Sequence, residues 1–173
     1  MKSQTFGVDL EDRAQLMVAF PRIMIMAGEV TAKAGDALIF EPFGLNVVKF
    51  SLLVTLTRSG EGISMSRLKD LSRMMRSPSN FTQMVDDLEA KKLVKRVASR
   101  EDRRVSLVEI TAKGNELVSQ VMVKYSQIMD EYLRDFPTNE LRDAVYVLIK
   151  WIWMTGDAAG IAHLKKTEEP FQE

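Results

Sequence analysis

The chain of 173 residues is long enough for one domain with a substantial core, and its 46% apolar and 28% charged residues exclude the disordered and fibrous classes. It has no cysteine, which excludes disulfide bonds and thiolate metal sites, and its formal net charge of +0 excludes a uniformly basic or acidic protein. Because we find no apolar leader and no apolar run of membrane-spanning length, we expect a cytoplasmic protein without membrane contact.

The charge is unevenly distributed along the chain. Residues 64–113 contain 12 Lys and Arg against 7 Asp and Glu, so this middle segment is basic and the flanking segments are acidic. A basic segment in a neutral protein is typical of a surface that binds nucleic acid, although the same excess spread round a solvated face would mean little.

The N-terminal part is predicted to be helical. Apolar residues recur at helical spacing over 9–33, and Pro21 should kink or split this helix. Glycine and proline predict a loop or short turn over 33–44. After it, Asn46 can cap a second helix that Gly60 ends.

Two short helices with a tight connection follow, which is the helix-turn-helix pattern. The first covers 64–75, and Ser77 and Pro78 suit the N-cap and the first position of the second. The apolar face of the second helix consists of Phe81, Met84, Val85, Leu88 and Leu93. Its first turns instead expose the polar residues Ser79, Asn80, Thr82 and Gln83.

The acidic residues in this second helix raise the alternative of a metal site. Asp86 and Asp87 point to different sides of the helix and have no histidine partner, so ion pairing or solvation is expected there. The sole histidine, His163, falls in a polar tail. We therefore expect neither a metal nor a cofactor.

The C-terminal half begins with a ribbon. Residues 94–110 should form two strands of β-branched residues around a charged bend. Thr111 can cap a long helix that Pro137 ends, and Thr138 or Asn139 can cap a last helix. Together with the two short helices before it, this hairpin makes a winged helix-turn-helix, in which the hairpin is the wing. The terminal helices carry more apolar surface than such a small core can cover, so we expect them to form a homodimer layer.

The segment VDDLEAKKLVKR, followed by Asp102-x-Arg104 and then by Val108, Ile110 and Thr111, resembles the MarR family of bacterial transcriptional regulators over roughly residues 20–155. The resemblance implies a homodimer on pseudo-palindromic double-stranded DNA, with one recognition helix in each major groove and one wing in each adjacent minor groove. It also implies a small-molecule effector, often an aromatic or phenolic acid, bound between the dimer layer and the DNA-binding lobe. The sequence itself identifies no effector pocket.

The contact residues expected from this reading lie in three groups. The recognition-helix group is Ser77, Pro78, Ser79, Asn80, Thr82 and Gln83, in which Gln83 or Asn80 can read adenine. The wing group is Arg100, Asp102, Arg103 and Arg104. The remaining candidates for phosphate contact are Ser66, Lys91, Lys95 and Arg96.

Within the wing the expected roles differ. Arg104 is the first choice for insertion into a narrow minor groove and Arg103 for a phosphate contact. Asp102 would repel DNA by itself, so it should hold Arg104 or the turn through a charge-assisted hydrogen bond. The alternative for this bend is a solvated hairpin tip with only local ion pairs.

The predicted fold class is mainly α with a small β-hairpin wing, in a single domain over 1–173. Residues 45–111 are predicted as the winged helix-turn-helix lobe, 8–44 and 112–155 as dimerisation helices, and 156–173 as a flexible tail. The predicted function is a sequence-specific DNA-binding regulator of transcription that acts as a repressor. We do not expect an enzyme, since no phosphate loop or nucleophile set is found. The alternative is a winged-helix protein-interaction module without DNA binding.

Overall fold

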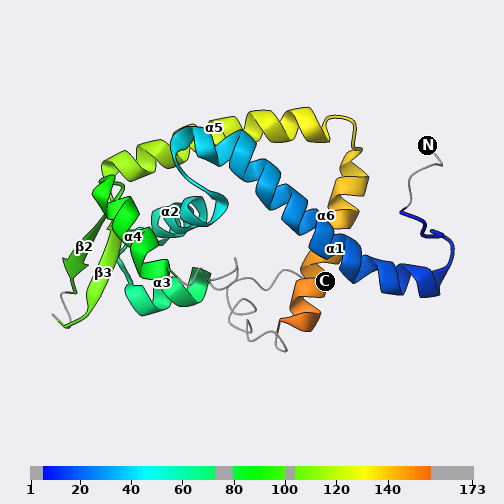
Figure 1. The fold of residues 1–173 in the computed structure, drawn as a ribbon, viewed down its shortest axis with the longest axis horizontal. Helices are drawn as coiled ribbons and strands as arrows, with labels where there is room; N and C mark the ends of the chain where they lie inside the picture. Colours follow the sequence, from blue (N-terminus) through cyan, green and yellow to red (C-terminus); the bar gives the residue numbers. More distant parts are fainter. Residues whose placement is uncertain (1–5, 73–79, 100–103, 157–173) are drawn as a thin grey trace.

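The computed structural model describes residues 6–72, 80–99 and 104–156. One lobe contains the helices α2 (Val47–Ser59), α3 (Met65–Ser72) and α4 (Phe81–Ala90) together with a small sheet. The long helices are α1 (Arg13–Gly35), α5 (Ala112–Leu133) and α6 (Thr138–Thr155). In Figure 1, α5 runs from the lobe along one edge of the molecule to α6, and α1 crosses beside α6. The predicted mainly α fold with a small β component is confirmed.

Helix α1 begins after Asp12, whose carboxylate accepts the backbone N–H groups of Ala14 and Gln15 at 2.8 and 3.3 Å. A kink or a split was expected at Pro21, and no split occurs, because the helix continues through this residue to Gly35. Proline removes only one hydrogen bond from a helix of 23 residues, and the turns on both sides persist. The ribbon changes direction within its N-terminal part (Figure 1), as a proline kink would produce.

The segment 33–44, predicted as a loop or short turn, consists mostly of helical turns and is not an open loop. A π-helical turn, Asp36–Phe40, and a 3-10 turn, Glu41–Phe43, continue the chain in helical form until Gly44, which has a φ of 67°. Ile39 and Phe40 are buried here, and the Phe40 ring stacks on that of Phe50 with centroids 5.0 Å apart. Burial of these apolar side chains favours helical turns where Gly and Pro by themselves predicted a loop.

Helix α2 has the predicted ends. The side chain of Asn46 accepts the backbone N–H of Lys49 at 2.9 Å, and Gly60 closes the helix with a φ of 65°. A second acceptor is contributed from outside the helix, because the Asp36 carboxylate takes the Val47 N–H at 2.6 Å. The start of α2 is therefore tied to the end of α1.

The sheet has one more strand than the sequence predicted. Strands β2 (Val94–Ala98) and β3 (Ser106–Ile110) form the expected antiparallel hairpin, and the two-residue strand β1 (Ile63–Ser64) pairs with β3 to give the order β1-β3-β2. Two residues are too few to show the alternation that identifies a strand.

Helix α5 starts as predicted and α6 does not. The Thr111 hydroxyl accepts the Gly114 N–H at 3.0 Å, which caps α5. In α6, Pro137 occupies the N-cap position and no side chain caps the helix, so the predicted caps Thr138 and Asn139 are already inside it. The predicted flexible tail lies outside the described residues from 157 onwards.

The core lies inside the lobe, around α2. The side chains with at most 2% exposure come from α2, α3, α4, the sheet, α5 and the turn after α1, and include Leu53, Leu56, Leu68, Val85, Leu88, Val94, Val108, Val121 and Ile39. The predicted apolar face of α4 is confirmed by the burial of Phe81, Met84, Val85 and Leu88, with Leu93 just beyond the helix. By contrast, α6 contains no buried residue and α1 contains only Ala19.

Candidate nucleic-acid interface

The N-terminal half of α4 presents uncommitted polar side chains to solvent. Asn80, Thr82 and Gln83 are exposed, and within the described part of the chain none of their side chains is hydrogen-bonded. Asn80 occupies the N-cap position without capping through its side chain. These groups are consequently available to a ligand, while Ser77, Pro78 and Ser79 lie outside the described residues.

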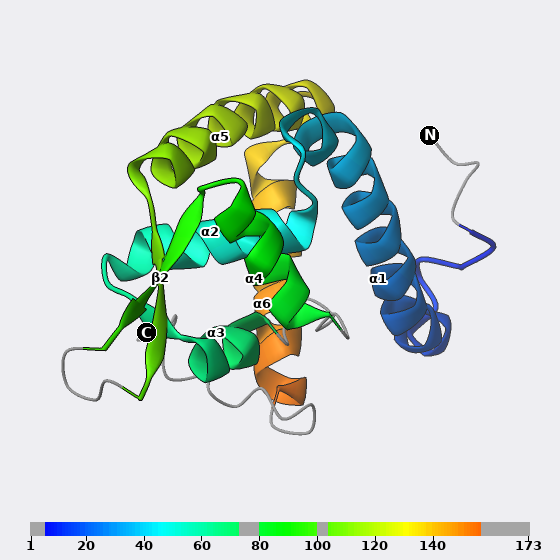
Figure 2. The ribbon, with the colours of Figure 1, turned by 60° about the vertical axis from the view of Figure 1, so that its left-hand side comes forward.

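The outer ends of strands β2 and β3 lie on the same side of the lobe as this end of α4. Figures 1 and 2 both place the outer end of the β2–β3 hairpin and the N-terminal end of α4 opposite to α5. The backbone N–H of Ser99 donates to the carbonyl of Val105 at 2.9 Å and closes the base of the bend. Arg104, the residue just before Val105, is exposed to solvent. The other predicted wing residues, Arg100, Asp102 and Arg103, lie outside the described residues.

Ser66 lies near the start of α3, where it is exposed and its hydroxyl is 3.3 Å from that of Ser64. The hydroxyl of Ser64 accepts the backbone N–H of Arg67 at 3.3 Å, as a residue at a helix start does. The sequence reasoning overlooked this cap, although serine just before an apolar-periodic segment is its usual signal.

The geometry of Lys91 does not support the predicted phosphate contact. Lys91 follows the last residue of α4, nine positions after Thr82, which is about 13 Å along the helix axis. Its Nζ donates to the carbonyl of Gly44 at 2.6 Å, and the Nζ of Lys113 donates to the Lys91 carbonyl at 3.0 Å. These contacts connect the C-terminal end of α4 to the starts of α2 and α5, on the side of the lobe away from the bend.

Lys95 and Arg96 differ although they are neighbours on β2. The Nζ of Lys95 is 2.9 Å from Glu109 Oε2, its partner across the strands, and the Lys95 side chain remains 56% exposed. An ammonium group has two further N–H donors, so this pair leaves Lys95 able to contact a phosphate. Arg96, at 27% exposure, instead turns toward α4, where it binds two carboxylates.

Two carboxylates accept hydrogen bonds from the Arg96 guanidinium. Asp86 Oδ1 accepts from Nη2 at 2.5 Å, and Glu89 accepts from Nη1. The hydrogen bond that Arg96 donates to Asp86, and then the one that it donates to Glu89, raise the pKa of the Arg96 guanidinium, as do the negative charges of both acids, against the opposing effect of burial. On the other side of α4, Asp87 pairs with Lys49 at 3.2 Å. The prediction that Asp86 and Asp87 point to different sides and form ion pairs is confirmed.

The described residues include no group of three or more His, Asp or Glu side chains placed to bind a metal ion. Within the same residues, no single helix is long and apolar enough to cross a membrane. The helical stretch Arg13–Phe43 and α2 reach that length and apolar composition only when they are counted together, and they meet at a bend of 68°.

Comparison with known proteins identifies similar regulators. The sequence model of the MarR family matches residues 43–105, which include α2, α3, α4 and strand β2 and end just before β3. The chain is 27% identical over 109 residues to the HTH-type transcriptional regulator YhbI of Bacillus subtilis, covering 61% of this chain and 66% of the relative. It is 32% identical over 90 residues to the HTH-type transcriptional regulator MhqR of the same organism, covering 52% and 60%. The matching regions thus span less than two thirds of the length of these relatives.

The fold is similar to that of a solved structure over nearly its full length. A MarR-like transcription regulator from Bacillus cereus superimposes with a TM-score of 0.66 at 28% sequence identity, covering 77% of this chain and 93% of the other. The superposition extends beyond residues 43–105 and therefore includes long helices outside the lobe as well as the lobe itself.

Proposed function

Because the chain belongs to the MarR family, we propose that it is a sequence-specific regulator of transcription that binds double-stranded DNA. The observation that carries the proposal is the placement of the N-terminal end of α4 and the outer ends of strands β2 and β3 on the side of the lobe opposite to α5 (Figure 2). A helix of this kind fits the major groove, and a neighbouring arginine favours the narrow, electronegative minor groove.

The contacts we propose follow from that placement. Gln83 and Asn80 can hydrogen-bond base edges, and an amide placed in the plane of adenine makes two such bonds. Arg104 enters the minor groove next to the base pairs that α4 reads. Lys95 and Ser66 contribute contacts to phosphates, which set the general affinity and not the sequence preference.

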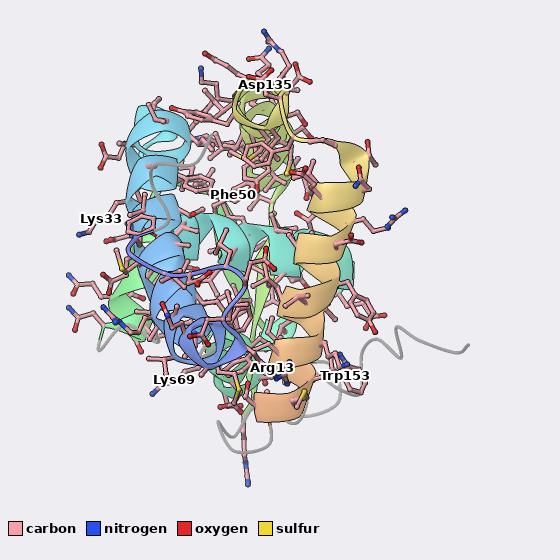
Figure 3. The ribbon with its side chains drawn as sticks, turned by 90° about the vertical axis from the view of Figure 1, so that its right-hand side faces the viewer. Arg13, Lys33, Phe50, Lys69, Asp135 and Trp153 are labelled. Atoms are coloured by element: carbon pink, nitrogen blue, oxygen red, sulfur yellow. The ribbon has the colours of Figure 1, made fainter. Side chains whose placement is uncertain are left out.

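We further propose that the protein acts as a homodimer. Its long helices leave large apolar side chains more than half exposed, among them Met17, Val18, Ile25, Val30, Val123, Tyr132, Val145 and Met154. In Figure 3, α1 and α6 descend side by side from α5, and they touch where Phe20 meets Trp151 with ring centroids 5.2 Å apart. A second copy would cover these faces, which a monomeric protein rarely leaves open to water.

This division assigns residues 45–111 to DNA binding and residues 8–44 and 112–155 to dimerisation. Two-fold symmetry then requires two half-sites, with centres about 34 Å apart on one face of the duplex.

A dimer bound over a promoter excludes other proteins from the same DNA, so we propose repression as its mode of action, in the cytoplasm. Release by a small aromatic or phenolic effector requires that the ligand favour a dimer whose recognition helices no longer match this spacing. A panel of such acids, tested for release of bound duplex, checks that step.

The experiment that tests the proposal begins with selection of a duplex from a random DNA library, using the full chain. Binding to the enriched duplex should weaken steeply as salt rises, since counterions released from phosphates dominate the affinity. Gln83→Ala should change the preferred sequence, and Arg104→Ala should weaken binding. Gln120→Ala on α5 and Arg142→Ala on α6 remove the same side-chain types from exposed positions outside the interface and should leave both properties unchanged.

The exposed apolar faces of α1, α5 and α6 also favour a second candidate, a winged-helix module that binds another protein and not DNA. It would be supported if no duplex were enriched and a stable hetero-complex formed instead. Analytical ultracentrifugation measures the oligomeric state. A homodimer that dissociates in Val145→Asp, with no other protein bound, would count against this second candidate.

A further inference from the structure

Among the described residues, the ionic contacts of helix α4 with the rest of the lobe all come from its C-terminal half. Asp86 and Glu89 contact Arg96 on β2, and Asp87 contacts Lys49 on α2. In the N-terminal half of the described helix, Thr82 and Gln83 have no side-chain hydrogen bond or ion pair. Phe81, Met84 and Val85 pack the N-terminal half against the core, and the ionic contacts that set the direction of its polar face are made further along the same helix.

Arg96 is the point at which α4 is joined to the wing. Its backbone N–H donates to Glu89 Oε1 at 2.9 Å, and its Nη1 and Nη2 bind Glu89 and Asp86 respectively. Asp86 and Glu89 are three positions apart, so they lie on one face of α4 and both reach the same planar guanidinium. Arg96 thus connects the helix to the strand that leads into the charged bend.

The same contacts oppose a direct role for Arg96 at a phosphate. The guanidinium has two carboxylates as partners, and the positive charge is already compensated. Those acids, Asp86 at 53% and Glu89 at 36% exposure, belong to the helix that would face polyanionic DNA, where uncompensated carboxylates repel phosphates. Replacing Arg96 should therefore release two negative charges at the interface and loosen the angle between α4 and β2.

We propose that Arg96 is a positioning residue for DNA recognition. It fixes α4 against β2, so that Gln83 and Arg104 reach adjacent grooves of the same half-site, and it does not itself bind a phosphate. This inference rests on the DNA-binding function proposed above and concerns the origin of sequence preference within it.

The test compares the enriched duplex with a scrambled duplex of the same length and composition, each titrated over a range of salt concentrations. Two quantities are measured, the ratio of the two Kd values and the slope of log Kd against log salt. Arg96→Met should reduce the ratio about tenfold, since coupled charge networks of this kind typically contribute that much. The salt slope should stay at its wild-type value because no phosphate contact is lost.

Two further variants separate positioning from folding. Asp86→Asn combined with Glu89→Gln removes the partners and keeps the arginine, and it should reduce the ratio as Arg96→Met does. Arg96→Lys retains the charge but cannot bind both carboxylates through one planar fork, so it should restore the ratio only in part. Lys95→Met is the contrasting variant, because this neighbouring cation of β2 does not contact α4 and is proposed above to contact a phosphate. It should weaken binding to both duplexes alike and lower the salt slope, so the ratio does not fall as it does in Arg96→Met.

Three results would overturn the inference. The first is a slope that falls by about 0.9 per protomer in Arg96→Met with an unchanged ratio, which identifies a phosphate contact. The second is tighter, equally selective binding by the Asp86→Asn, Glu89→Gln variant, which shows that the acids only obstruct DNA. The third is a wild-type ratio in every folded variant. If the wild-type protein itself prefers neither duplex, the proposed function fails and the inference fails with it.

Discussion

Substitution of Gly114 by alanine tests how closely α5 is packed against the turn that follows α4. A Cβ at this position would lie 2.2 Å from the carbonyl oxygen of Leu93 and 2.7 Å from Cγ1 of Ile110. The Leu93 carbonyl cannot simply move away, because it accepts the backbone N–H of Thr111 at 3.0 Å and is 3.1 Å from the Thr111 hydroxyl. The substitution must therefore displace the backbone where β2, β3 and α5 meet.

The expected loss of stability follows from three contributions. Alanine in place of glycine favours a helix by up to about 1 kcal/mol. Overpacking at a rigid contact costs about 1 to 3 kcal/mol, and weakening the two contacts of Thr111 with Leu93 costs about 1 kcal/mol each. The free energy of unfolding should fall by at least about 2 kcal/mol, which lowers the Tm of a chain of this size by about 4 to 8 °C.

The matched control is Gly28→Ala, because a Cβ at Gly28 in α1 would meet nothing within 4 Å. This variant should gain up to about 1 kcal/mol from helix propensity. Thermal unfolding followed by circular dichroism, at one protein concentration for all variants, measures both changes. An unchanged or raised Tm in Gly114→Ala would refute the reasoning that this contact is rigid.

Two further predictions concern the core and the first helix. Leu53→Ala removes a side chain with 0% exposure at the centre of the lobe and should lower the free energy of unfolding by about 2 to 5 kcal/mol in urea; a loss below about 1 kcal/mol would contradict the place of α2 in the core. Hydrogen bonds from the Gln15 side chain, and then from the backbone of Gln15 and Ala14, lower the pKa of Asp12 below 3.8. The resulting stabilisation of α1 is present above pH 3.8 and is lost as the pH falls through the lower pKa of the folded state. An NMR titration of the Asp12 carboxyl should therefore have its midpoint below pH 3.8. A midpoint at or above that pH would be incompatible with this cap.

Features that depend on neighbours a few residues apart could be predicted from the local sequence. Asn46 and Thr111 cap their helices and Gly60 ends α2, because each acts on backbone groups within one turn. The buried face of α4 was likewise predictable, since a period of 3.6 residues places its apolar side chains on one side. The family resemblance rested on the same local segment, from α4 through the hairpin.

Features that depend on partners far apart in the chain could not be predicted in this way, because they arise when the elements pack together. Burial of Ile39 and Phe40 made helical turns of a segment whose composition predicted a loop, and pairing with β3 made a strand of Ile63 and Ser64. Lys91, Lys95 and Arg96 look alike in the sequence, yet one faces Gly44, one a cross-strand glutamate and one two acids on α4. A side chain's charge is written in the sequence, but the direction in which it points depends on packing between elements, and this direction separates a candidate DNA contact from a residue that holds the fold together.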